Sequence, residues 1–396
     1  MVAPQEDDSN NQGRLPLLVA EPDEEDSFSA CLFFMDDNHF LAEWLAYHYT
    51  VLPLRRLIVT VDRKSQKSPL EILERFKGLI NITIVDLEEF YPEEMSIRDY
   101  WKINMGDFTD AQRAANKVMG HRSRQNEFQL HCLRTLRAEN WNWVTNVDTD
   151  ERIIIDYKYA TRPPKTIRDR PYLNSSCLNF PRYHFGSREE EDESKLFEDF
   201  PSNTSLSPLS LATHRWRYRA SMAQPGMNGK STLGLKRCAD CSIDKSEAHM
   251  LLFGHCPKNL LIAGNRKPFV VNHYPGTLKQ FSLRADPRKV MKSTTEFERI
   301  KQQISKEEDV NAREWLADFI DQVGLERAEH LLAGVGELAE KSLTPKDDLF
   351  VDISNYTESE LKRIACSTKL GCKYVAPKGI EGRSRNETEG TKSSKN

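Results

Sequence analysis

The stretch SACLFFMDDNHFLAEWLAYHYTVLPLRRLIVTVD, residues 29–62, places an apolar run, an amphipathic segment and a second apolar run in direct succession. Residues 29–35 have the length and composition of a buried strand. Residues 39–51 carry apolar side chains at helical spacing, and residues 56–62 are rich in β-branched residues and end in an acid. The stretch therefore predicts a strand, a helix and a second strand.

The same alternation continues along the chain. Residues 68–79 begin with Ser and Pro and have helical periodicity, and residues 81–87 form a third predicted strand. Strands that alternate with helices are typical of a parallel sheet covered by helices. We therefore predict an α/β fold with a mostly parallel sheet flanked by helices.

The elements after residue 90 are predicted from shorter patterns. Residues 90–121 are irregular and polar, whereas residues 123–140 have the periodicity of an amphipathic helix. The segment 187–212 is predicted to be a loop, and we find no internal repeat. Further strands are predicted at 143–148, 152–157, 177–186, 249–254 and 268–274.

Composition and periodicity divide the chain into four expected regions. Residues 1–27 are acidic and polar, and residues 379–396 are polar, so both ends are expected to be disordered. Residues 28–290 hold the predicted α/β domain. Residues 291–378 are expected to be a mostly helical C-terminal extension, because residues 294–364 are mostly of helical pattern.

The overall composition excludes several classes of protein. Apolar residues make up 38% of the 396 residues and the net charge is −4, which is typical of a soluble globular domain. No Lys/Arg stripe interleaved with aromatic residues is present, so we expect no nucleic-acid partner. No apolar run reaches the ~18 residues that cross a bilayer, and the first residues lack a signal-peptide pattern.

Two features nevertheless point toward a lumenal compartment. The chain has eight cysteines, an even number that is weakly indicative of disulfides. It also has more Asn-x-Ser/Thr sequons than the roughly two or three expected by chance. The sequons fit a lumenal protein whose membrane anchor lies outside this chain or has been lost from it. The sequons begin at Asn81, Asn174, Asn203, Asn355 and Asn386.

Acidic residues follow three of the predicted strands. Asp36 and Asp37 come after the first, Asp62 after the second, and Asp148 after the strand that contains Val147. In an open parallel sheet, ligands bind outside the carboxyl ends of the strands. The shared position of these acids is therefore more informative than any one of them.

The sequence DTDE, residues 148–151, crowds Asp148, Asp150 and Glu151 between two apolar runs. Carboxylates side by side repel one another, which a fold accepts most readily when a cation or water lies in front of them. Mn²⁺ or Mg²⁺ prefers such oxygen ligands and combines one or two carboxylates with substrate phosphates. The alternative is a solvated turn between two strands, where Asp is common.

Other polar residues are candidates for parts of a nucleotide site. Asp36, Asp37 and Asp62 can accept hydrogen bonds from a ribose or a base, although capping of a turn or helix explains such residues as well. His273 follows an apolar run and can be a metal ligand or a structural histidine before a turn. Arg124, near the start of the predicted 123–140 helix, can meet a phosphate or belong to a solvated face.

Two local motifs have a less specific meaning. Cys238 and Cys241 have the spacing of half a zinc ribbon, but the only nearby second pair is poorly spaced. A disulfide, or two unrelated thiols, is the better interpretation. The segment NGKST, residues 228–232, lacks the glycine and the preceding strand of a P-loop, and we reject that motif.

In their order along the chain, these segments resemble glycosyltransferases of the GT-A fold, in the family-2-like and family-92-like group. The resemblance covers about residues 29–285. It rests on DDNHFLAEWLAYHY, on RQNEFQLHCLRTLRAEN, on the DTDE segment, on Gly229-Lys230 and on the closing His273-Tyr274-Pro-Gly-Thr277. The chain departs from the family at Arg152, where Phe is usual, and at Pro53, where Gly is common. Many members also carry an N-terminal anchor.

The resemblance implies transfer of a sugar from a nucleotide-sugar donor to a hydroxyl of a glycan, glycoprotein or glycolipid acceptor. It implies that Asp150, with Asp148 and His273, holds Mn²⁺ (or Mg²⁺) against the diphosphate. Asp62 would contact the nucleoside, and Lys230 of the Gly-Lys segment would take part in donor binding. It also implies a Golgi or ER lumen location, the alternative being the cytoplasm.

An inverting reaction also needs a carboxylate that accepts the proton of the acceptor hydroxyl. The candidates for this base are Glu189, Glu190, Glu191 and Asp244. Two other functions use the same acids: a nucleotidyltransferase, and a non-catalytic protein that binds a nucleotide-sugar or a glycan. The nucleotidyltransferase usually needs a Gly-rich phosphate loop, and residues 28–45 contain no Gly.

Overall fold

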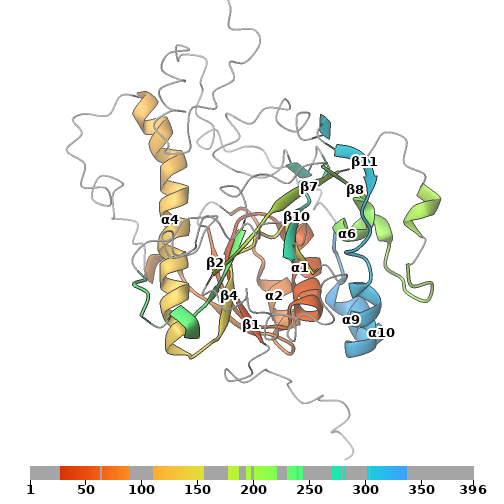
Figure 1. Ribbon diagram of the computed structural model, residues 1–396, viewed down its shortest axis with the longest axis horizontal. Helices are drawn as coiled ribbons and strands as arrows, with labels where there is room; N and C mark the ends of the chain where they lie inside the picture. Colours follow the sequence, from red (N-terminus) through yellow and green to blue (C-terminus); the bar gives the residue numbers. More distant parts are fainter. Residues whose placement is uncertain are drawn as a thin grey trace, which may run out of the picture.

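The computed structural model describes residues 27–62, 65–89, 110–155, 177–186, 193–197, 200–220, 230–238, 240–243, 269–277, 280–281, 301–302 and 304–336. These residues form two sheets with helices packed on them (Figure 1). The mixed α/β class that the sequence predicts is therefore confirmed. The predicted strand at 249–254 lies outside the described residues.

The first sheet has six strands in the order β3-β2-β1-β4-β9-β6. Strands β3, β2, β1 and β4 are parallel to one another, whereas β9 is antiparallel to both β4 and β6. The predicted parallel arrangement is thus found in the four strands β3, β2, β1 and β4. In the order of the sheet, the strands span Asn81–Ile84, Leu54–Val61, Phe28–Phe34, Trp143–Thr145, Lys230–Gly234 and Cys177–Phe180.

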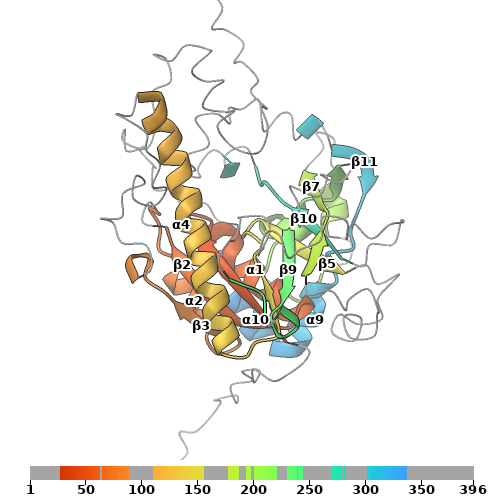
Figure 2. The same cartoon turned by 60° about the vertical axis from the view of Figure 1, so that its left-hand side comes forward.

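Helices bury both faces of this sheet. Along β1, Ala30, Leu32 and Phe34 belong to the apolar cluster that contains helix α1 (Asn38–Val51). Cys31, between them, belongs to the cluster formed with helix α4 (Asp110–Ala138). Figures 1 and 2 show α4 along one side of the strands and α1 with α2 (Leu70–Phe76) on the other. This explains why β1 is a nearly continuous apolar run rather than an alternating one.

The second sheet has five strands in the order β11-β8-β7-β10-β5 and is mainly antiparallel. Only β7 and β10 run parallel. Ile153 of β5 and Val271 of β10 share the apolar cluster of α1, so the two sheets are packed on one core. In sheet order, the strands span Ile304–Glu308, Tyr218–Ala220, Arg182–Gly186, Phe269–His273 and Glu151–Ile155.

The C-terminal part of the described chain contributes two helices and a strand. Helix α9 (Trp315–Val323) buries Trp315 and Phe319 against α1, and α10 (Leu325–Leu331) follows directly. Strand β11 was not anticipated, because it lies in the segment expected to be mostly helical. The short helices span Leu87–Glu89, Glu193–Leu196, Pro208–Ser210, Ala212–Arg215 (α6) and Lys236–Cys238.

Three elements differ from the sequence-based prediction. Helix α4 begins at Asp110, so the prediction of irregular structure over 90–121 was wrong for residues 110–121, and residues 90–109 lie outside the described residues. The sequence of the first turns of α4, DAQRAANK, is rich in helix formers such as Ala, Gln, Arg and Lys but has no clear apolar period. Helix α2 starts two residues later than predicted, and the Ser68 hydroxyl accepts a bond of 3.2 Å from the Leu70 amide. Pro181 divides the predicted 177–186 strand into β6 and β7.

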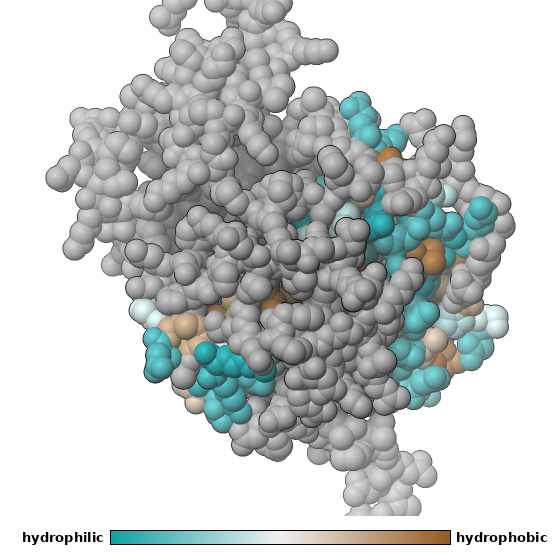
Figure 3. Space-filling model, viewed as in Figure 1, coloured by the Kyte–Doolittle hydropathy of each residue, from teal (hydrophilic) through white to brown (hydrophobic). Residues whose placement is uncertain are grey.

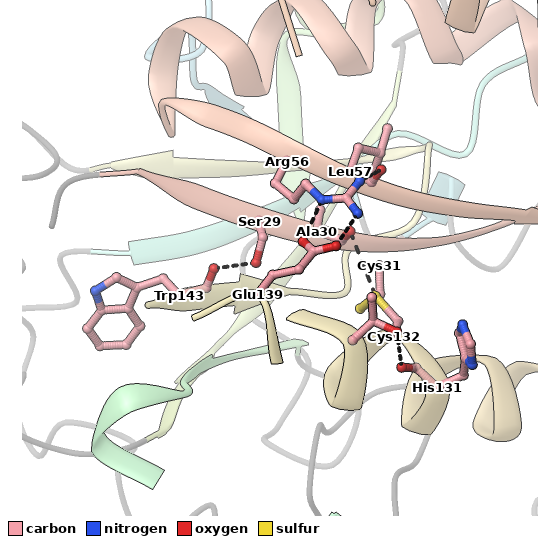
Figure 4. Close-up of a disulfide and its surroundings, with 10 residues drawn as sticks. Ser29, Ala30, Cys31, Arg56, Leu57, His131, Cys132, Glu139 and Trp143 are labelled. Carbon is pink, nitrogen blue, oxygen red and sulfur yellow. Dashed lines mark hydrogen bonds and ion pairs between the residues drawn. A yellow bond between two sulfur atoms is a disulfide. The ribbon is translucent and has the colours of Figure 1, made fainter. Parts of the chain in front are cut away.

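A disulfide between Cys31 and Cys132 joins β1 to α4 (Figure 4). Beside it, the buried Arg56 of β2 forms an ion pair of 2.6 Å with Glu139 just after α4. A second disulfide joins Cys238 to Cys241, which settles the choice between a zinc ligand pair and a disulfide. The Cys31–Cys132 disulfide and the Arg56–Glu139 ion pair fix α4 on the sheet.

The surface of the described residues is mixed in polarity. In the face shown in Figure 3, hydrophobic residues form small separate areas among hydrophilic ones. None of the helices that the structure describes is both long and apolar enough to cross a membrane. The large apolar side chains exposed in this part of the chain are Leu70, Phe197, Leu209 and Val310.

Candidate functional site

The site lies where the strand order of the first sheet reverses direction. After β1 the chain builds β2 and β3 on one side, and it later returns to place β4 on the other side of β1. Ligands of open α/β sheets bind outside the carboxyl ends of the strands at such a point. Asp37 follows β1, and the Thr149 hydroxyl, which follows β4, donates a hydrogen bond of 2.9 Å to its carboxylate. The two strand ends are therefore joined directly.

Residues 148–151 form a tight turn between β4 and β5. The Glu151 amide donates to the Asp148 carbonyl at 2.9 Å, and the Asp148 amide donates to the Glu151 carboxylate at 2.9 Å. Glu151 is fully buried, and its other oxygen accepts a bond of 3.2 Å from Arg182. Glu151 thus holds the shape of the turn, while the Asp148 side chain is 44% exposed and faces solvent.

Lys230 supplies the positive charge that the crowded carboxylates need. Its ammonium nitrogen lies 2.8 Å from Asp148 and 3.2 Å from Glu151, and it donates to the Asn146 carbonyl at 3.3 Å. Burial alone would lower the pKa of Lys230, but the two carboxylates outweigh it and raise the pKa above its ordinary value. Lys230 therefore stays charged beneath the turn.

Asp150, His273 and His184 form a chain of hydrogen bonds. His273 Nε2 lies 3.0 Å from Asp150 Oδ2, and His273 Nδ1 lies 2.8 Å from His184 Nδ1. The register of the second sheet places His273 of β10 between Glu151 of β5 and His184 of β7. With Asp150 ionised and both rings neutral, His273 donates from Nε2 and His184 donates from Nδ1.

Asp62 and Arg124, two of the candidates for donor binding, are paired with each other. One guanidinium nitrogen of Arg124 donates to both Asp62 oxygens, at 2.9 and 3.2 Å, and both side chains are buried. Arg124 lies in the middle of α4, so the prediction that it sits near a helix N-terminus was wrong. A nucleoside role for Asp62 stays a prediction.

Asp36 anchors a neighbouring loop. Its Oδ1 accepts hydrogen bonds from the Gln66 amide at 2.7 Å, the Lys67 amide at 2.9 Å and the Ser65 hydroxyl at 3.0 Å. This is the turn-capping role that was weighed against a ligand role in the sequence. Asp36 itself has a positive φ of 55°, a conformation that Asp tolerates better than most residues.

Sequence reasoning did not assign roles to Arg152, Glu43, Arg182 and His184. Arg152 is fully buried, forms an ion pair of 3.3 Å with Glu43 and donates to the Thr149 carbonyl at 2.7 Å. Glu43 in turn accepts from the Ala212 and Thr213 amides, at 2.7 and 2.9 Å. The signal for Arg152 was its presence where the resembled family has Phe. The signal for His184 was a polar residue inside a predicted strand.

Four of the candidate residues have no structural account. Glu189, Glu190, Glu191 and Asp244, proposed as the catalytic base, lie outside the described residues. The base therefore stays a prediction. Asp37, Asp148, Asp150, Lys230 and His273 are the candidates that the geometry brings together at one edge of the structure.

The Asp150 and His273 atoms fit adjacent positions around one divalent ion. Two ligands at right angles with bonds of about 2.1 Å lie about 3 Å apart, and Asp150 Oδ2 and His273 Nε2 are 3.0 Å apart. Within the described ranges, no group of three or more His, Cys, Asp or Glu side chains is arranged to hold a metal ion. A divalent ion held by this pair would take its remaining ligands from substrate phosphates and water.

Comparison with known proteins gives little further information. No protein-family model and no curated protein matches the sequence. Among solved structures, the chain is similar to a mannosyltransferase, PcManGT from Pyrobaculum calidifontis, in complex with GDP-Man and Mn²⁺. The identity is 11%, the match covers 82% of this chain and 80% of that one, and the TM-score is 0.28. A TM-score this low supports no conclusion about the present site.

Proposed function

We propose that this protein is a metal-dependent glycosyltransferase that moves a sugar from a nucleotide-sugar to an acceptor hydroxyl. One observation carries the proposal. A carboxylate and an imidazole at the spacing of adjacent metal ligands lie beside an exposed carboxylate and a buried, charged lysine, at the reversal point of a parallel sheet. The resemblance of the motif order to GT-A glycosyltransferases supports the same class.

In this proposal, Asp150 and His273 hold Mn²⁺ or Mg²⁺, and the exposed Asp148 approaches it from the same turn. When bound, the ion neutralises the charge that develops on the leaving nucleoside diphosphate. Lys230 keeps Asp148 in place and adds positive charge on the diphosphate side. Asp37, whose carboxylate accepts a hydrogen bond from Thr149, would also accept one from the nucleoside.

The test is calorimetric titration of the purified chain with UDP and GDP, with and without Mn²⁺. We expect a nucleoside diphosphate to bind only when Mn²⁺ is present. Asp150→Asn and His273→Gln should each weaken that binding by more than the roughly 10–100-fold typical of a lost outer partner. Asp318→Asn, which changes an exposed acid on α9, is the matched control and should bind like the wild type.

Two results would contradict the proposal. Absence of nucleotide binding under every condition would refute the metal–diphosphate site. Mn²⁺-dependent binding without transfer or hydrolysis of any nucleotide-sugar would instead identify a non-catalytic nucleotide-sugar-binding protein.

A further inference from the structure

Two of the five sequons lie in the part of the chain that the structure describes, and in both the asparagine is exposed. They are Asn81-Ile82-Thr83 and Asn203-Thr204-Ser205. An N-linked glycan is bulky and strongly hydrated, so it needs an asparagine that points into solvent from the folded chain. Both asparagines meet this requirement.

Asn203 lies in a surface turn that is held by hydrogen bonds to helix α10. The Glu329 carboxylate of α10 accepts hydrogen bonds from the Ser205 amide at 2.5 Å and from the Thr204 hydroxyl at 3.0 Å. These contacts hold the backbone on either side of the modified position without using the Asn203 side chain. A glycan at Asn203 can therefore extend into solvent with the turn unchanged.

Asn81 begins β3, the terminal strand of the first sheet among the described residues. Its backbone pairs inward with Arg56 of β2, and the Arg56 guanidinium contacts the Asn81 carbonyl and the Thr83 hydroxyl at 3.3 and 2.9 Å. An edge strand is a template for unwanted pairing with another chain unless something covers it. A glycan on Asn81 would project from the face of the sheet at this strand and would hinder the approach of another chain.

The cysteines give an independent indication of the compartment. Each of the five cysteines in the described ranges is in a disulfide. The Cys31–Cys132 bond joins residues 101 apart in the sequence and is buried between β1 and α4, so it is a structural link rather than an exposed, exchangeable pair. Such disulfides persist in oxidising compartments and are rare in reducing ones.

From these two observations we propose that the chain matures in an oxidising secretory lumen and carries N-linked glycans on Asn81 and Asn203. In each case the amide nitrogen forms a bond to the anomeric carbon of an oligosaccharide held on a lipid diphosphate. The bond from that carbon to the diphosphate breaks, the lipid diphosphate leaves, and the amide proton passes to a base of the transferring enzyme. The proposal does not depend on the proposed glycosyltransferase activity.

The test is site mapping on the full chain purified from the cells that naturally produce it. Enzymatic release of N-glycans in water enriched in heavy oxygen converts each glycosylated Asn into a labelled Asp, which peptide mass spectrometry locates. Label at both Asn81 and Asn203 supports the proposal. Unmodified peptides at both positions would overturn it, and label at one position alone would refute it for the other.

Matched variants in the same cells separate glycosylation from effects on folding. Ser205→Ala removes the sequon at Asn203 yet keeps the backbone bond to Glu329, whereas Ser205→Thr preserves the sequon. We expect only the Ser205→Ala variant to migrate faster in electrophoresis, by the mass of one glycan. Thr83→Ser should retain the glycan at Asn81 and the hydroxyl that Arg56 contacts. Equal mobility of the two Ser205 variants would contradict the assignment at Asn203.

Discussion

His184 is placed to orient the proposed metal ligand His273 through the contact between their Nδ1 atoms. Metal-binding histidines usually use their second ring nitrogen for such a bond, which fixes the tautomer and the ring orientation. Here, coordination through His273 Nε2 requires the His273 proton on Nδ1, so His184 Nδ1 must become the acceptor. The two rings must exchange roles when the ion binds.

We therefore predict that His184→Phe weakens Mn²⁺ binding by about 10–100-fold, because His273 loses its acceptor. His184→Asn, whose amide lies near the position of Nδ1, should restore most of the affinity. Titration of Mn²⁺, followed by electron paramagnetic resonance, gives the affinity without any need for turnover. Equal affinity in wild type and the Phe variant would assign His184 a packing role only.

The buried Glu43–Arg152 pair makes a second prediction. Glu43→Gln should lower the free energy of unfolding by about 3–5 kcal/mol, because it leaves the Arg152 charge unpaired in the core. Replacing both, as Glu43→Gln with Arg152→Met, should recover part of the loss. Denaturant unfolding followed by circular dichroism measures all three. A double variant less stable than Glu43→Gln alone would show that Arg152 matters mainly for its bond to the Thr149 carbonyl.

The crowded acids at 148–151 show which features of the site could be predicted from the sequence. The sequence indicated that the crowded carboxylates need a cation or water in front of them, and it named Asp148, Asp150, Lys230 and His273 as candidates for one site. It did not indicate that Lys230 supplies that cation from within the protein, since the pairing joins residues 82 apart. It also could not separate Glu151, which is wholly structural, from its neighbours.

Helix α4 is the element whose position depends most on a single covalent link. Arg124 lies about two turns before Cys132, on the same face of the helix, so the Cys31–Cys132 disulfide sets the register in which Arg124 reaches Asp62. Without the link, the long helix would be held by apolar packing and by polar contacts such as the Arg124–Asp62 ion pair.

Cys31→Ala with Cys132→Ala should lower the free energy of unfolding by about 2–4 kcal/mol, because the bond closes a long loop. The matched pair Cys238→Ala with Cys241→Ala should cost less, since those residues are only three apart in sequence. Chemical denaturation of both variants, and of wild type under reducing conditions, makes the comparison. Equal losses would show that loop closure is not the source of the stability.

Elements were predictable from sequence where a local pattern determines them. The strands β1, β2 and β10 and the helix α1 were found within two residues of their observed ends, because burial gives each a clear period or run. The antiparallel pairing of the second sheet was not predictable, since it depends on which distant strand supplies the partner. The strand β11 was missed because a polar run, ISKEE, gives no β pattern.

The molecule as a whole should lose stability in mild acid. Burial, reinforced by Arg313, lowers the pKa of His214 from 6.5 to about 3, and burial followed by Arg152 lowers the pKa of His48. Both rings are neutral in the folded chain but take up a proton when unfolded below pH 6.5. The contribution of these two rings to the free energy of unfolding is therefore fully present above pH 6.5. It falls as the pH drops below that value, by about 1.4 kcal/mol per pH unit for each ring.

Replacing one of these rings should flatten that dependence. His214→Phe keeps an aromatic ring between Phe200 and Trp315 and removes one titrating group. Thermal unfolding of wild type and variant from pH 7 to pH 4 provides the measurement. We expect the two curves to converge as the pH falls, and parallel curves would contradict the assignment.

The strand order of the first sheet also dictates when the site can exist during synthesis of the chain. Strands β1, β2 and β3 pair through short connections, whereas the Ser29 hydroxyl of β1 and the Trp143 carbonyl of β4 meet across 114 residues. Contacts that distant in sequence form slowly, after local ones. A nascent chain can thus build its first three strands early, but Asp150 and His273 meet only once β10 has been made.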